Sequence, residues 1–79
     1  MQVQVLFFGA TADIAGKRRI EIDVAKDVAA KIVFDQLLAE HPRLADHKLH
    51  FSINQQFSSG DEIVNDGDEL AIFTAVSGG

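Results

Sequence analysis

The fold of this chain is decided by Glu69-Leu70-Ala71-Ile72-Phe73-Thr74-Ala75-Val76-Ser77-Gly78-Gly79, its closing stretch. Apolar side chains in residues 69–75 alternate between two faces, and this period of two predicts a strand. The strand leads directly into residues 76–79, which we expect to form a flexible tail. Because glycine has no side chain, Gly78-Gly79 can enter a narrow channel and presents an unhindered carboxylate. Two terminal glycines also arise by chance in about one chain in 200, so the tail needs support from the rest of the chain.

A second strongly apolar strand is predicted at the other end of the chain. Residues 2–8 alternate, with the valines and Phe7 on one face. Residues 19–24 alternate as well, and we expect them to pair with the first strand as an antiparallel hairpin. The connection between them contains a helical turn over residues 11–15, closed by Gly16. Since the first and last strands are the most hydrophobic, we expect them to lie side by side at the centre of the sheet.

One amphipathic helix is predicted in the middle of the chain. The side chain of Asp27 can cap its first turn. Pro42 ends it, because the residue before a proline is pushed out of helical geometry. Between these two residues, the positions that face the core repeat with the period of a helix: Ala30, Val33, Phe34, Leu37 and His41.

The remaining segments complete a small sheet. Residues 49–53 alternate and predict a third strand, residues 62–64 predict a short edge strand, and Asn65-Asp66-Gly67-Asp68 is a turn by composition. A single helix can cover only one face of such a sheet. The sequence therefore predicts an α+β fold of the ubiquitin-like, β-grasp kind. It has a mixed sheet of four to five strands and one main helix, in a single domain over residues 1–79.

Composition excludes several classes of function. The chain has 79 residues, a net charge of −5 and a single basic cluster, Lys17-Arg18-Arg19, which argues against a nucleic-acid partner. It contains no cysteine, so neither a disulfide nor a thiol nucleophile is available. No apolar run reaches membrane-spanning length and no signal peptide opens the chain, so we expect a cytoplasmic protein without a membrane partner.

No residue pattern outside the tail predicts catalysis or metal binding. Gly9 and Gly16-Lys17 are too far apart for a phosphate loop, and the residue that follows them is Arg18 instead of a hydroxyl. Residues 62–67 lack the ligand spacing of a calcium loop, and no serine stands in a context that would activate it. Three histidines fall on different predicted elements, so we expect no metal site and no bound cofactor: His41, His47 and His50.

The face of the sheet that the helix leaves open is predicted to be apolar. Leu6 and Phe8 on the first strand, and Phe73 on the last, point away from the helix. If these strands are neighbours, the three side chains form one patch, which Phe57, in a polar loop after the third strand, could extend. Contiguous apolar patches mark partner sites. The alternative is that Phe8 folds over an edge or that single apolar side chains are simply exposed.

With these features in place, the chain resembles the small subunit of molybdopterin synthase, the ubiquitin-like sulfur carrier of molybdenum cofactor biosynthesis. The resemblance extends over essentially the whole chain. Two positions depart from the family: Thr74-Ala75 replaces its usual pair of prolines, and Ala12-Asp13 replaces its frequent Arg-Glu. The matching pieces are Val5-Leu6-Phe7-Phe8, His41-Pro42-Arg43-Leu44, Ile53-Asn54, Asp66-Gly67-Asp68-Glu69-Leu70-Ala71 and Val76-Ser77-Gly78-Gly79.

The resemblance implies a carrier that is not itself catalytic. An adenylating enzyme would use ATP to convert the Gly79 carboxylate into an acyl-adenylate, and a sulfur donor would turn this into a thiocarboxylate. The tail of Val76, Ser77 and Gly78 would then enter the large synthase subunit, in a heterotetramer. There the sulfur would attack a cyclic pyranopterin monophosphate to build the dithiolene. Apolar positions that the family uses against its partners match Phe8, Phe57 and Phe73.

Three other functions share these features. A thiamine-pathway sulfur carrier has the same fold, tail and activation but a different acceptor. A ubiquitin-like protein modifier would end in an isopeptide bond between Gly79 and a lysine. The last alternative is a plain interaction module whose tail is accidental.

Overall fold

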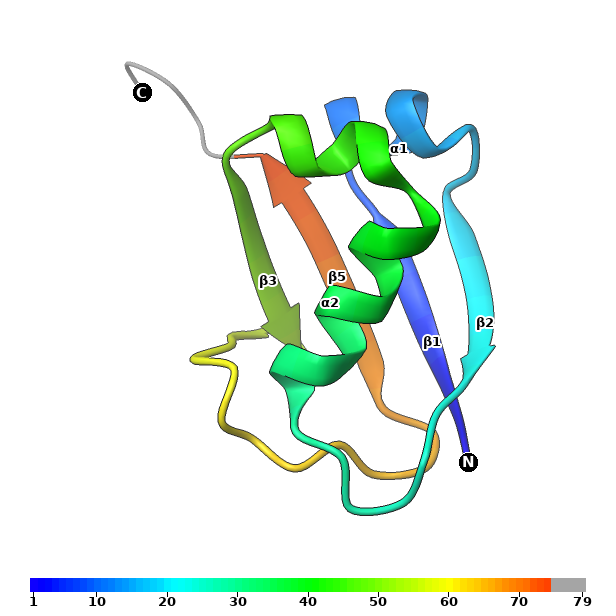
Figure 1. Cartoon of the computed structure of the whole chain (residues 1–79), viewed down its shortest axis with the longest axis vertical. Coiled ribbons are helices and arrows are strands. Elements are labelled where there is room, and N and C mark those ends of the chain that lie inside the picture. The colour runs from blue at the N-terminus through cyan, green and yellow to red at the C-terminus, as the bar shows by residue number, and fades with distance from the viewer. Residues whose placement is uncertain (75–79) are drawn as a thin grey trace.

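The alternating segments assemble into one five-stranded sheet, and a long helix crosses one of its faces (Figure 1). The structure is a computed structural model, which describes residues 1–74. In chain order the elements are β1 (Gln2–Phe7), α1 (Ala10–Ala15), β2 (Arg19–Asp23), α2 (Ala30–Glu40), the 3₁₀ helix η1 (Pro42–Asp46), β3 (Leu49–Ile53), β4 (Gln56–Phe57) and β5 (Glu69–Thr74).

The strand order β2-β1-β5-β3-β4 confirms the predicted neighbours. β1 pairs with β2 as an antiparallel hairpin and with β5 in parallel, while β3 pairs antiparallel with both β5 and β4. The sheet is therefore mixed, and the α+β class predicted from the sequence is confirmed. β5, the strand that leads towards residue 75, is flanked on both sides.

The core lies between the sheet and α2. Because side chains alternate along a strand, β1 and β5 each send every second residue beneath the helix. Burying one such side chain stabilises the fold by about 1.5–3 kcal/mol. The residues of these three elements that form the core cluster are Val3, Val5, Phe7, Leu70, Ile72, Ala30, Val33, Phe34 and Leu37.

The predicted cap of α2 is wrong. Asp27 has φ of 57° and lies outside the helix, whose N-cap is Ala29 with no side-chain hydrogen bond. The first free N–H groups are satisfied instead by a loop distant in sequence. Ala30 N–H donates to the Glu62 carbonyl at 2.8 Å and Lys31 N–H to the Gly60 carbonyl at 3.0 Å. Backbone carbonyls thus accept the hydrogen bonds that a capping side chain would otherwise accept.

The other end of α2 agrees with the sequence. The helix stops at Glu40, His41 forms its C-cap, and Pro42 opens η1. The His41 ring, predicted to lie on the helix's core-facing stripe, meets the edge of Phe7 with the ring centres 5.7 Å apart. The predicted helical turn after β1 is also present as α1, and Gly16 closes it with φ of 75°.

Two details of the sheet differ from the prediction. Phe57, expected in a loop, lies in the two-residue strand β4, paired with Ser52 of β3. The edge strand expected at residues 62–64 is absent from the described part of the chain, where Ile63 makes only a single antiparallel bridge to Ala29. Segments this short carry too few residues for the period of two to be recognised.

Candidate functional site

The side of the sheet opposite α2 carries a row of residues that crosses all five strands. The strand registers place Arg19 opposite Leu6, Leu6 opposite Ala71, Ala71 opposite Ser52 and Ser52 opposite Phe57. Residues directly opposite one another point to the same face. Ala71 and Ser52 are nevertheless buried, with 7% and 9% of their surface exposed. Larger neighbouring side chains cover them.

Those neighbours are aromatic. The Phe73 ring centre lies 5.8 Å from that of Phe57 and 5.7 Å from that of His50, which stacks on it. His50 also meets Phe57 edge-on at 6.2 Å. A hollow of about 370 Å³ opens where Phe57, Phe73, Phe8 and the Ser52–Ala71 pair meet. We call this surface, made of Leu6, Phe8, His50, Phe57 and Phe73, the aromatic face.

The aromatic face is accessible. Phe57 is 76% exposed and Phe8 is 50% exposed, which is unusual for phenylalanine. Isolated exposed apolar residues need no explanation, but here several converge around one hollow. Aromatic side chains in such a setting bury large areas at little entropic cost when a partner covers them.

The structure places the residues predicted for this surface together. Leu6, Phe8 and Phe73 lie on the open face, as the alternation predicted, and Phe57 extends it from β4. The sequence prediction omitted His50, although its place between Leu49 and Phe51 already assigned it to the open face. An aromatic, partly polar residue beside a predicted partner strand is the signal that could have found it. A role for these side chains in binding stays a prediction.

The predicted chemistry of the chain falls on its tail. Val76, Ser77, Gly78 and Gly79 lie outside the described residues, as does Ala75. β5 ends at Thr74, so the last described residue is a neighbour in sequence of Phe73 on the aromatic face.

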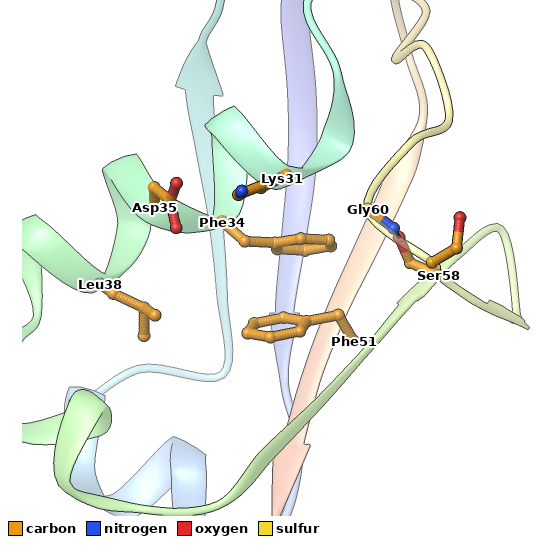
Figure 2. A pocket seen from close by; sticks show the side chains of 8 residues that line it. Lys31, Phe34, Asp35, Leu38, Phe51, Ser58 and Gly60 are labelled. Carbon is orange, nitrogen blue, oxygen red and sulfur yellow. Dashed lines mark hydrogen bonds between the residues drawn. The ribbon is translucent and has the colours of Figure 1, made fainter.

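A second, smaller pocket lies on the helix side of the sheet (Figure 2). Phe34 of α2 and Phe51 of β3 stack with their ring centres 4.1 Å apart and form one wall. The loop with Ser58 and Gly60 closes the opposite side, and Lys31 lies at the rim. The Ser58 hydroxyl and the N–H groups of Ser59 and Gly60 are hydrogen-bonded within the loop itself, so this pocket has the features of a packing junction between α2 and β3.

Those loop groups converge on Glu62. Its carboxylate accepts hydrogen bonds from the Ser59 N–H at 2.9 Å, the Ser58 hydroxyl at 2.8 Å and the Gly60 N–H at 3.0 Å. These donors favour the charged form and lower the pKa of Glu62 to about 2, with the Ser59 N–H as the largest cause. The carboxylate stabilises the same loop whose carbonyls cap α2.

Over residues 1–74, no three His, Asp or Glu side chains gather as a potential metal site. His41 contacts Phe7 and His50 contacts Phe73, so these two rings belong to different sides of the sheet. Within the same residues, no helix is long and apolar enough to cross a membrane.

A mixed five-stranded sheet beneath one main helix, with an aromatic open face beside the last strand, defines a ubiquitin-like β-grasp protein. The chain belongs to the ThiS family, whose model matches residues 5–79. It is 34% identical over 83 residues to the human molybdopterin synthase sulfur carrier subunit, covering 99% of this chain and 94% of the human protein. The family resemblance predicted from the sequence is thereby confirmed.

Two solved structures show the range of similar proteins. The crystal structure of SAMP1, the small archaeal modifier protein 1, from Haloferax volcanii matches with a TM-score of 0.87 at 28% identity, over 100% of both chains. A chain in the complex of subunits 1 and 2 of molybdopterin-converting factor from Helicobacter pylori matches with a TM-score of 0.71 at 24% identity, again over 100% of both. The second likeness bears on the fold alone.

Proposed function

We propose that this protein is the sulfur carrier subunit of a molybdopterin synthase and acts in the cytoplasm. The observation that carries the proposal is the position of the aromatic face, which includes Phe73 and adjoins the end of the strand that leads to the diglycine tail. Membership of the ThiS family and full-length similarity to the human sulfur carrier subunit support it. A docking surface beside a reactive tail is what a carrier needs, because its partners must bind it and act on its end.

The first step is activation of the Gly79 carboxylate. An adenylating partner joins the carboxylate to AMP from ATP and releases pyrophosphate. Sulfide-level sulfur from a donor then attacks the acyl carbon, AMP leaves, and the terminus becomes a thiocarboxylate. The carbonyl carbon of an acyl-adenylate is open to attack because AMP is a good leaving group, whereas a free carboxylate is inert.

The second step is delivery. The large synthase subunit would bind the aromatic face, admit the tail and hold a cyclic pyranopterin monophosphate. The thiocarboxylate sulfur attacks a carbon of the pterin side chain and displaces an oxygen substituent from it, water cleaves the acyl–sulfur bond, and Gly79 returns to a carboxylate. A second loaded carrier supplies the second sulfur of the dithiolene in the same way. Catalytic groups belong to the partners. The full-length similarity to the human protein, which is named as a subunit of molybdopterin synthase, supports a large-subunit partner here.

A second candidate is a ubiquitin-like modifier, favoured by the likeness to the Haloferax volcanii modifier protein over 100% of the chain. In that case a lysine amine, and not sulfide, attacks the activated Gly79. A thiamine-pathway carrier would differ from our proposal only in the acceptor of the sulfur.

Mass spectrometry of the protein purified from its native host separates these functions. We expect a fraction of the chain with one oxygen replaced by sulfur, and sulfur transfer when the large subunit and the cyclic pterin are added. Ladders of conjugates would indicate a modifier instead. A thiocarboxylate that loads but does not transfer to the pterin would favour the thiamine pathway. A terminus that stays unmodified with the adenylating enzyme, ATP and a sulfur donor would contradict all carrier functions.

A further inference from the structure

The charged residues around the aromatic face are unevenly distributed, with arginines prevailing at one end and carboxylates at the other. At its β2 edge, Arg19 lies opposite Leu6 in the strand register, and both residues point to the open side of the sheet. Arg18 and Arg19 line one surface hollow together with Leu6 and Phe8, and Asp13 is the single carboxylate among the residues that line it. Both arginines are exposed. Two guanidinium groups therefore stand at one edge of the aromatic face, in a chain whose net charge is −5.

Carboxylates occupy the next rows of the same face, further from the end of β5. Gln4 lies opposite Glu21 on one side and opposite Glu69 on the other. One row further, Gln2 lies opposite Asp23, and its N–H is bound by the side chain of Asp66 at 2.9 Å. The open side thus runs from the arginines at one end, across the aromatic rings, to carboxylates at the other, where Glu69 borders the aromatic hollow.

This arrangement bears on how a partner is oriented. Apolar contact is not directional, so the aromatic face alone would accept a partner in several rotations about the sheet normal. When a face carries opposite charges at its two ends, a partner with the complementary charges binds in one rotation. The reverse rotation is unfavourable, because it brings charges of the same sign on the two proteins together. A tail carrier needs one rotation, because only one sends the end of β5 towards the partner's channel.

We propose that this surface docks in a single orientation, on a partner protein that places carboxylates against Arg18 and Arg19 and basic side chains against Glu21 and Glu69. The inference rests on the proposed function, because it takes the large synthase subunit as the occupant. It adds to that function the charge pattern which the partner's surface must carry. The net charge of −5 does not reveal this pattern, because the end of the aromatic face nearest to the end of β5 is the basic one.

The test compares two double variants of the full chain for binding to the large synthase subunit of the same organism. Arg18→Glu with Arg19→Glu reverses the basic edge. Lys26→Glu with Lys31→Glu makes the same change in net charge at exposed residues away from the open face. At low salt we expect the arginine variant to raise Kd by about tenfold or more and the lysine variant by less than about twofold. The difference should shrink as salt is added.

The outcomes separate the two proposals. Equal Kd values for the wild type and the arginine variant would overturn the inference and leave the proposed function standing. Failure of the wild-type chain to bind the large subunit would overturn both. A wild-type chain that sediments as a dimer, and is dispersed by the arginine variant, would show that a second copy occupies the face. Glu21→Lys gives an independent check, with an expected rise in Kd of about threefold or more.

Discussion

The hydroxyl of Thr11 lies 2.9 Å from the carbonyl oxygen of Ile72, 61 positions further along the chain. The same hydroxyl lies 2.7 Å from the Phe8 carbonyl, and the threonine is fully buried. Ile72 accepts a further hydrogen bond from the Phe8 N–H at 3.0 Å. α1 is thereby joined to the ends of both β1 and β5, at the point where β5 runs towards the tail.

Replacing this hydroxyl should weaken the fold by a measurable amount. Thr11→Val keeps the shape but removes the donor, and a buried hydrogen bond is worth about 0.5–1.5 kcal/mol. We expect a loss of about 1 kcal/mol in the free energy of unfolding by urea. Thr11→Ser should recover most of it because it keeps the hydroxyl. Equal stability of the valine variant and the wild type would show that the bond contributes nothing.

A charge on the aromatic face should prevent docking without unfolding the domain. Phe73→Asp places a carboxylate between Phe57 and His50, where a partner would have to desolvate it. We expect at least a tenfold rise in Kd for the large subunit and a near-native circular dichroism spectrum. Ile32→Asp is the control, because Ile32 is 53% exposed on α2, on the other side of the sheet. Unfolding of the Phe73 variant would mean that its side chain is needed for the core.

Removing the last residue should abolish chemistry but not folding. Deletion of Gly79 moves the carboxylate one residue back, so the shortened tail no longer places it for adenylation. We expect no thiocarboxylate and a melting temperature within about 1 °C of the wild type, since the last residue of a chain generally contributes little to stability. Ser77→Ala, which keeps the tail length, should still load sulfur. Loading of the shortened chain would disprove the carrier role of Gly79.

The Glu62 carboxylate should make the domain less stable in acid. Its pKa in the folded protein is about 2, below the ordinary value of 4.5. The unfolded chain therefore binds a proton first, and the stabilisation is present above pH 4.5 and is lost as the pH falls towards 2. The free energy of unfolding of the Glu62→Gln variant should be lower than that of the wild type at pH 6, and the two values should approach each other at pH 3. Urea denaturation at both pH values measures this, and a constant gap would contradict it.

The strand predictions succeeded where the alternation was long. β1, β3 and β5 each have at least five residues, enough for the period of two to assign every side chain to a face. Leu6 and Phe73 were placed on the open face for this reason, whereas Phe8, predicted to be in the first strand, lies just beyond the end of β1. β4 has only two residues, so nothing in the sequence separated Phe57 from its polar loop.

The start of α2 shows a different kind of failure. A side-chain cap is a local interaction and can be read from neighbouring residues, which is why Asp27 was chosen. The real partners of the Ala30 and Lys31 N–H groups are carbonyls of Gly60 and Glu62. Any residue offers a backbone carbonyl, so no residue type marks such a cap in advance.

The sequence by itself determined which side chains share a face, because the period of a strand follows from local backbone geometry. It also determined that the chain's candidate chemistry lies at Gly79 and that no thiol competes with it. Only the tertiary structure decided the register of the strands and the places of β3 and β4 in the sheet. That pairing brings Arg19, Leu6 and Phe57 from distant segments into one row and gathers the carboxylates at the other end of the face. Strand order and register depend on long-range packing, which no local pattern specifies.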